Sequence, residues 1–138
     1  MAKVAVVYWS GSGNTQAMAE AVAEGAKGAG AEVDLLEADG FSAVDGYDGL
    51  AFGCPAMGDE ELEDSVFEPM FAGVEGSLSG KKVALFGSYG WGDGGWMRSW
   101  EERCQGKGIT LATESVIANE SPDDAAIASC KALGAALA

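Results

Sequence analysis

Six consecutive residues near the N-terminus have the composition of an anion-binding loop. They are Ser10, Gly11, Ser12, Gly13, Asn14 and Thr15, which supply three hydroxyls, one amide and two glycines. The glycines let the backbone turn several N–H groups toward one point, and a helix that begins here adds unpaired donors and a partial positive charge. The segment contains no Lys or Arg. We therefore expect it to hold a phosphate group with neutral donors at a helix N-terminus.

Three alternatives compete for this segment. A nucleotide-hydrolysing P-loop ends in Gly-Lys followed by Ser or Thr, and the absence of that lysine argues against it. A dinucleotide-binding fingerprint is a closer rival, because Gly11 and Gly13 match its first two glycines and Glu37 lies near its acidic position, but Gln16 stands where the third glycine belongs. A turn that only caps the helix is the third alternative, although a cap needs one hydroxyl rather than this cluster.

Two further glycine-bearing segments carry large flat or soft side chains. The first contains Pro55, Ala56, Met57, Gly58, Asp59 and Glu60, and the second contains Ser88, Tyr89, Gly90, Trp91 and Gly92. Sulfur and indole both make favourable contacts with aromatic faces. We expect Met57 and Trp91 to grip a planar, partly apolar ring between them.

Strands and helices must alternate along the chain if these loops are to meet. Short apolar runs predict strands at residues 4–8, 32–36, 50–54, 83–88 and 110–117. Apolar residues at helical spacing predict helices at residues 15–29, 62–71, 96–106 and 122–137. The alternation predicts an α/β fold, a doubly wound five-stranded parallel sheet with helices on both faces. With strand order 2-1-3-4-5, a ligand lies beyond the carboxyl ends of strands one and three, where the three loops meet.

Length, charge and residue usage narrow the function further. The 138 residues fit one domain, 1–138, and a net charge of -14 argues against nucleic acid and anionic membranes and favours basic partners. Histidine is absent, which removes the commonest general base and metal ligand, so we expect no metal site. Three widely spaced cysteines and the lack of a signal-type segment indicate a cytoplasmic protein.

Two groups of residues whose types suggest chemistry are better explained by packing. Trp96 and Trp100 are four residues apart on a predicted helix, a spacing typical of core packing. Cys54 ends a predicted strand, and a phosphatase-type loop would need Arg where Glu60 stands. We therefore expect Cys54 to be a small core residue.

Taken together, the three loops closely resemble those of the short-chain flavodoxins of anaerobic bacteria, and the resemblance covers essentially the whole chain. It implies a flavodoxin-like fold with non-covalently bound FMN. The residues implied to bind the phosphate are Ser10, Ser12, Asn14 and Thr15, with nearby backbone N–H groups and the Ser88 hydroxyl. Pro55 departs from some relatives, which carry a hydroxyl residue at this position.

The resemblance also implies roles around the flavin ring. Met57 covers one face and Trp91 stacks on the other, while Glu60 accepts a hydrogen bond from the flavin N3–H. The backbone of Gly90 and Trp91 reaches the pyrimidine edge. The peptide after Gly58 flips on reduction, so that its carbonyl bonds the protonated N5 of the semiquinone, and glycine makes that flip cheap.

The function implied is a low-potential one-electron carrier, and not a stand-alone catalyst. It would cycle mainly between semiquinone and hydroquinone and shuttle electrons between redox enzymes with basic docking surfaces, as a monomer. Two alternatives stay open: an FMN-dependent NAD(P)H or quinone reductase of the same fold, and a receiver-like module. The reductase would need room for a second substrate, and the receiver would need acidic residues where Ser10 and Pro55 stand.

Overall fold

The computed structural model describes residues 2–57, 61–90, 92 and 94–138. Its elements in chain order are β1 (Lys3–Tyr8), α1 (Asn14–Gly28), β2 (Glu32–Glu37), β3 (Gly49–Gly53), α2 (Phe67–Val74), a short 3-10 turn (Glu75–Ser77), β4 (Lys82–Tyr89), α3 (Gly95–Gly106), β5 (Val116–Asn119) and α4 (Asp124–Leu137). None of the helices in these ranges is long and apolar enough to cross a membrane.

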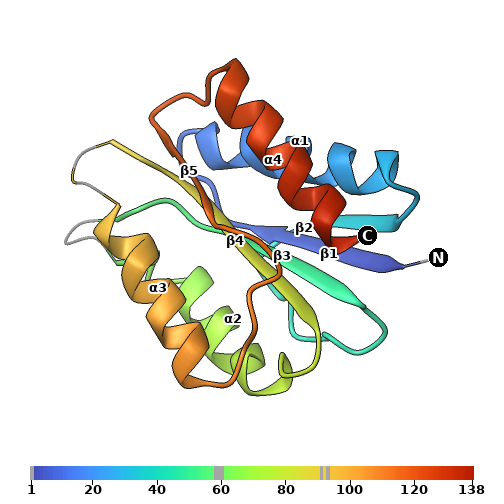
Figure 1. The fold of residues 1–138 in the computed structure, drawn as a ribbon. Coiled ribbons are helices and arrows are strands. Elements are labelled where there is room, and N and C mark those ends of the chain that lie inside the picture. The colour runs from blue at the N-terminus through green and yellow to red at the C-terminus, as the bar shows by residue number, and fades with distance from the viewer. Residues whose placement is uncertain (1, 58–60, 91, 93) are drawn as a thin grey trace.

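The five strands form one parallel sheet in the order β2-β1-β3-β4-β5 (Figure 1). This confirms the predicted α/β fold and the strand order 2-1-3-4-5. Because the chain reverses its direction of winding between β1 and β3, the loops that follow these strands separate to opposite faces and leave a crevice between them.

The helices cover the sheet in two layers, with α1 and α4 on one face and α2 and α3 on the other (Figure 1). Alternate residues of β1 point to the two layers, as the two-residue period of a strand requires. Val4 and Val6 belong to the core cluster beneath α1 and α4. Ala5 and Val7 belong to the cluster with the aromatic residues of α2 and α3. Both faces of β1 are therefore buried, which explains its continuous apolar run.

Two glycines allow α1 and α4 to pack closely. A Cβ atom built on Gly25 would lie 2.0 Å from the carbonyl oxygen of Lys131, and one built on Gly134 would lie 2.0 Å from the carbonyl oxygen of Val22. Either contact is far shorter than van der Waals distance, so neither helix accommodates a larger residue at these positions without moving.

The helix predicted at residues 62–71 is wrong in its position, because α2 begins only at Phe67. The Glu63 carboxylate accepts hydrogen bonds from the backbone N–H groups of Ser65, Val66 and Phe67. These side-chain bonds hold residues 63–66 in a non-helical turn, in the way that a capping residue competes with helix formation.

The strand predicted at residues 110–117 is also wrong in its start, because β5 begins at Val116. The preceding segment pairs with the sheet at Leu111, in an isolated bridge with Val83. The end predicted for α2 at residue 71 is also wrong, because the helix continues to Val74. The remaining predicted boundaries agree with the structure to within two residues. For α4 the shift has a visible cause, because Asp123 caps the helix by accepting a hydrogen bond of 2.8 Å from the Ala126 N–H.

Candidate functional site

The segment from Ser10 to Thr15 joins β1 to α1, as the sequence predicts for a phosphate loop. Gly13 is the residue before the helix, has a φ of 94°, and offers no side-chain cap. Its own N–H donates to the Ser10 Oγ over 3.0 Å, which tightens the turn. The first turn of α1 carries no acidic residue. The N–H groups at the start of α1 are therefore open to an anion, and no negative side chain of that turn opposes one.

A buried pair of hydroxyls lies at the same helix end. The Thr15 Oγ1 and the Ser88 Oγ share a hydrogen bond of 2.8 Å across 73 residues of sequence. The two residues are 1% and 4% exposed. Two hydroxyls carry two protons and their mutual bond uses one, so the pair has one further proton to donate to a ligand.

The second predicted loop follows β3 and is fastened to the third. The Ala56 N–H donates to the Ser88 carbonyl oxygen over 3.0 Å, and Met57 forms paired backbone bonds with Glu61, of 2.9 and 3.0 Å. The Met57 side chain is 37% exposed, which is unusual for a large apolar group and leaves it available to a ligand. The predictions for Gly58, Asp59 and Glu60 concern positions outside the described residues.

The third loop follows β4. Its Tyr89 ring lies 5.5 Å from the ring of Trp96, and its carbonyl oxygen accepts hydrogen bonds from the Glu120 N–H and the Asn119 side chain. A Cβ atom on Gly87 would lie 2.2 Å from the Cys54 carbonyl oxygen, so β3 and β4 approach closely just before the two loops diverge. Trp91, predicted to stack on a ring, also lies outside the described residues.

These three loops line one pocket of about 340 Å³. Its lining residues are Trp9, Gly11, Ser12, Asn14, Pro55, Ala56, Met57, Ser88, Tyr89, Gly90 and Glu120. All of them except Trp9 and Glu120 are residues that the sequence singles out. Among the other predicted residues that the structure describes, Ser10, Gly13 and Thr15 support the pocket from the turn and helix start behind it, and Gly92 is exposed with a φ of 87°.

Trp9 and Glu120 are the pocket residues that sequence reasoning missed. Trp9 directly follows β1, and a Cβ atom on Gly11 would lie 3.1 Å from its ring, so the indole packs over the loop. Glu120 follows β5 and has a φ of 58°, a sparsely populated conformation for a residue with a side chain. Ligands of such sheets lie beyond the carboxyl ends of the strands, so Glu120 could have been predicted as a pocket residue from its position directly after β5.

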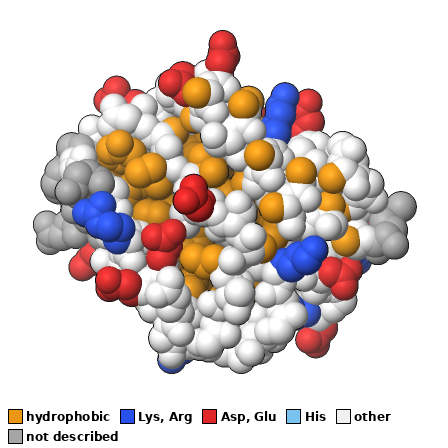
Figure 2. All heavy atoms as spheres, viewed as in Figure 1, with side chains coloured by type: hydrophobic (Ala, Val, Ile, Leu, Met, Phe, Trp, Pro, Cys, Tyr) orange, Lys and Arg blue, Asp and Glu red, His pale blue; other side chains and the backbone are white. Residues whose placement is uncertain are grey.

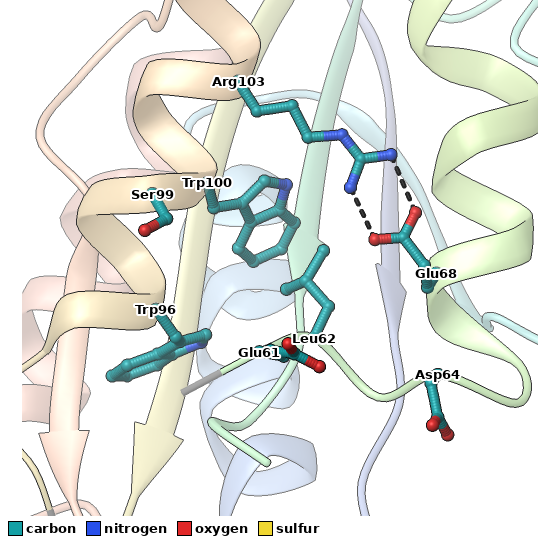
Figure 3. A pocket seen from close by; sticks show the side chains of 8 residues that line it. All are labelled: Glu61, Leu62, Asp64, Glu68, Trp96, Ser99, Trp100 and Arg103. Atoms are coloured by element: carbon teal, nitrogen blue, oxygen red, sulfur yellow. Dashed lines mark hydrogen bonds and ion pairs between the residues drawn. The ribbon is translucent and has the colours of Figure 1, made fainter. Parts of the chain in front are cut away.

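A larger pocket, of about 540 Å³, lies beside α2 and α3 (Figure 3). Its cation, Arg103, is held by two bonds to the Glu68 carboxylate, of 2.6 and 2.8 Å, and by one to Glu75 of 2.7 Å. The hydrogen bonds to the Glu68 carboxylate raise the pKa of Arg103 well above its usual range, although partial burial of the guanidinium opposes this shift. Since the guanidinium is already neutralised and the remaining charged lining residues are acidic, this larger pocket is a poor phosphate site.

The tryptophans and Cys54 behave as the sequence suggests. Trp96 and Trp100 are 1% and 2% exposed and belong to the core beneath α2 and α3. Cys54 is fully buried, and burial raises the pKa of its thiol to about 12. The thiol is therefore protonated at neutral pH and is a poor nucleophile.

Comparison with known proteins identifies the family. The flavodoxin family model matches residues 6–133. The flavodoxin of Megasphaera elsdenii is 48% identical over 98% of this chain and 98% of its own length, and that of Clostridium beijerinckii is 48% identical over 87% and 88%. The solution structure of two-electron reduced Megasphaera elsdenii flavodoxin superposes with a TM-score of 0.88 over 97% of both chains. The chain therefore belongs to the flavodoxin family of FMN-binding electron-transport proteins.

Proposed function

We propose that this flavodoxin is a low-potential one-electron carrier that cycles mainly between the semiquinone and hydroquinone states of non-covalently bound FMN. It shuttles electrons between redox enzymes and is not a stand-alone catalyst. The observation that carries the proposal is the pocket at the switch point of the sheet. It combines neutral phosphate donors with an exposed methionine, and none of its lining residues in the described part of the chain is Lys or Arg.

The donor set fits the phosphate of FMN. The pocket is lined by Ser12, Asn14 and Ser88, and the Ser88 hydroxyl is bonded to that of Thr15 in the first turn of α1. These side chains and the N–H groups at the start of α1 would hold the phosphate. Ser10 shapes the turn through its bond to the Gly13 N–H. Phosphate binding of this kind depends on the placement of dipoles rather than on a charged side chain.

The rest of the pocket suits the flavin ring, which supplies the one-electron chemistry when it is bound. Met57 would present its thioether to one face of the ring, and the Gly90 backbone would face the pyrimidine edge. Pro55, Ala56 and Tyr89 also line the pocket and would shield the ring from water. Stacking by Trp91, the hydrogen bond from N3–H to Glu60, and the peptide flip at Gly58 complete this proposal.

Charge supports a low potential. The chain carries 22 acidic against 8 basic residues, and Glu120 lines the pocket itself. Negative groups near an anionic reduced flavin oppose its formation, by about 0.4 kcal/mol or roughly 20 mV for each charge at about 10 Å in water.

The same charge defines the partners. Acidic side chains are spread around the visible face, with basic ones in only a few places (Figure 2). Such a surface steers basic docking surfaces of redox enzymes and repels nucleic acid and anionic membranes. We propose a single-domain monomer, residues 1–138. The three cysteines are buried and free, which fits the reducing cytoplasm.

A visible absorption spectrum and a redox titration of the purified protein with FMN test this function. We expect flavin bands, a semiquinone that accumulates at intermediate potentials, and a second couple more negative than that of free FMN. A protein that stays colourless with FMN would refute the proposal. Oxidation of NADPH without a partner enzyme would favour the reductase instead.

A further inference from the structure

Glu63 is a buried carboxylate in the segment between the second loop and α2. It is 5% exposed and is the only charged residue in the buried core of the described chain. Its Oε1 accepts hydrogen bonds of 2.8 Å from the N–H groups of Val66 and Phe67, and its Oε2 accepts one of 2.8 Å from that of Ser65. Burial raises the pKa of Glu63, but these N–H groups outweigh it and leave the pKa lowered. The group is therefore a carboxylate at neutral pH.

The backbone of Glu63 is tied to the sheet as well as to the helix. Its N–H donates to the Cys54 Sγ over 3.3 Å, and its carbonyl oxygen accepts from the Glu68 N–H over 2.9 Å. Cys54 directly follows β3 and is in turn bonded through its N–H to the Phe86 carbonyl oxygen of β4. Glu63 thus joins the carboxyl edge of the sheet to the start of α2.

Two residues before Glu63 the chain leaves the second loop. Glu61 and Met57 bond each other in both directions through their backbones, over 2.9 and 3.0 Å, so the entry and exit of this loop are joined directly. Any shift of the segment after Glu61 moves this pair, and with it the Met57 side chain in the pocket. The placement of Met57 therefore depends on how firmly residue 63 is held.

We propose that Glu63 is a positioning residue for FMN, whose carboxylate fixes the exit of the second loop so that Met57 lies against the flavin face. The inference rests on the proposed function, since it needs FMN in this pocket. A carboxylate suits the role because it accepts from all three N–H groups without presenting a proton. A glutamine would turn an N–H₂ group toward at least one of these donors and leave that donor unsatisfied.

The test compares Glu63→Gln with Asp64→Asn, which removes the same charge from the adjacent, exposed residue. The Kd of FMN is measured by quenching of flavin fluorescence, and the visible circular dichroism of the bound flavin reports its surroundings. We expect the Kd to rise about tenfold in Glu63→Gln, with a changed dichroism spectrum. In Asp64→Asn the Kd should stay within about twofold, since a charge exposed to water acts weakly. Glu63→Asp keeps the charge on a shorter side chain and should fall between the unaltered protein and Glu63→Gln.

Each outcome decides a separate point. If the unaltered protein does not bind FMN, the proposed function fails and the inference fails with it. If Glu63→Gln matches Asp64→Asn in Kd and dichroism while only its apoprotein unfolds more easily, Glu63 stabilises the fold without positioning the loop.

A measurement on the unaltered protein covers the case in which Glu63→Gln does not fold. Coupling between sites is reciprocal, so FMN should slow amide hydrogen exchange at Ser65, Val66 and Phe67 by about tenfold. Exchange at these three amides that is the same with and without FMN would overturn the role of Glu63.

Discussion

Replacing the buried hydroxyl pair tests how the pocket recognises phosphate. A single substitution mixes two effects, because removing the Ser88 Oγ leaves the Thr15 Oγ1 buried without its 2.8 Å partner. A phosphate would then offer the stranded hydroxyl a new acceptor and mask the loss. The double variant Thr15→Val, Ser88→Ala removes both groups together, and valine keeps the shape of threonine.

The magnitudes for the double variant follow from the geometry. Removing both members of a hydrogen-bonded pair is nearly neutral for stability, so the apoprotein should change by less than about 1 kcal/mol. The phosphate loses at least one hydrogen bond to a charged group, worth about 1.5–3 kcal/mol. The Kd of FMN should therefore rise about 10- to 150-fold.

Riboflavin provides the control, because it has the same ring and ribityl chain without the phosphate. Its Kd should stay within about threefold of that of the unaltered protein, as expected when a lost interaction involves only the missing group. Ser99→Ala removes an exposed hydroxyl that does not line the proposed FMN pocket, and it should change the Kd of neither FMN nor riboflavin. Equal weakening of FMN and riboflavin would show that the pair shapes the pocket as a whole, and an unchanged Kd of FMN would place the phosphate elsewhere.

Three other perturbations have signs that the structure determines. Glu120→Gln removes the acidic side chain that lines the pocket. It should raise the potential of the low-potential couple by about 20 mV, which is the effect of one charge at about 10 Å in water. A redox titration that shows no shift would contradict this role of Glu120. Gly25→Ala should lower the free energy of unfolding measured in urea. The added Cβ atom would lie 2.0 Å from the Lys131 carbonyl oxygen, and this clash outweighs the gain of about 1 kcal/mol in helix propensity. A stabilised variant would refute the close contact between α1 and α4. Because the pKa of Glu63 is lowered in the folded protein, its carboxylate stabilises the fold fully at pH values above 4.5, the ordinary pKa of the group. That stabilisation is lost as the pH falls through the lowered pKa. The difference in unfolding free energy between the unaltered apoprotein and Glu63→Gln should accordingly narrow only in acid, and a difference that stayed constant through the acid titration would refute this assignment.

The sheet order and the meeting of the three loops were predictable from the sequence. Apolar runs that alternate with helical periodicity allow few topologies, and parallel strands end at one edge of their sheet. That rule alone brings Ser88 beside Thr15, although 73 residues separate them. Applied to the segments after β1, β3 and β4, this rule finds the lining residues of the pocket other than Trp9 and Glu120.

The start of α2 and the role of Glu63 were not predictable in the same way. Apolar spacing around Leu62 favours a helix, and nothing local marks Glu63 as buried. Its side chain reaches the N–H groups of the next turn because the Cys54 sulfur and the core hold its backbone in place. Tertiary contacts thus override local periodicity here. The positive φ at residue 120 was equally hard to predict, because a glutamate rather than a glycine or asparagine stands at that position.

Because the described lining residues of the pocket include no Lys or Arg, we make a final prediction about salt. A cradle built on lysine attracts the phosphate dianion, so salt would weaken its binding of FMN. In the proposed site neutral donors hold the phosphate while a net charge of -14 repels it. Arg103 lies in the larger pocket beside α2 and α3, where Glu68 and Glu75 bind it. Raising the ionic strength should therefore lower the Kd of FMN and raise the potential of the low-potential couple, because both changes relieve repulsion between negative charges. Weaker FMN binding at high salt, measured by fluorescence titration, would show that an electrostatic attraction contributes to phosphate binding and would refute the neutral cradle.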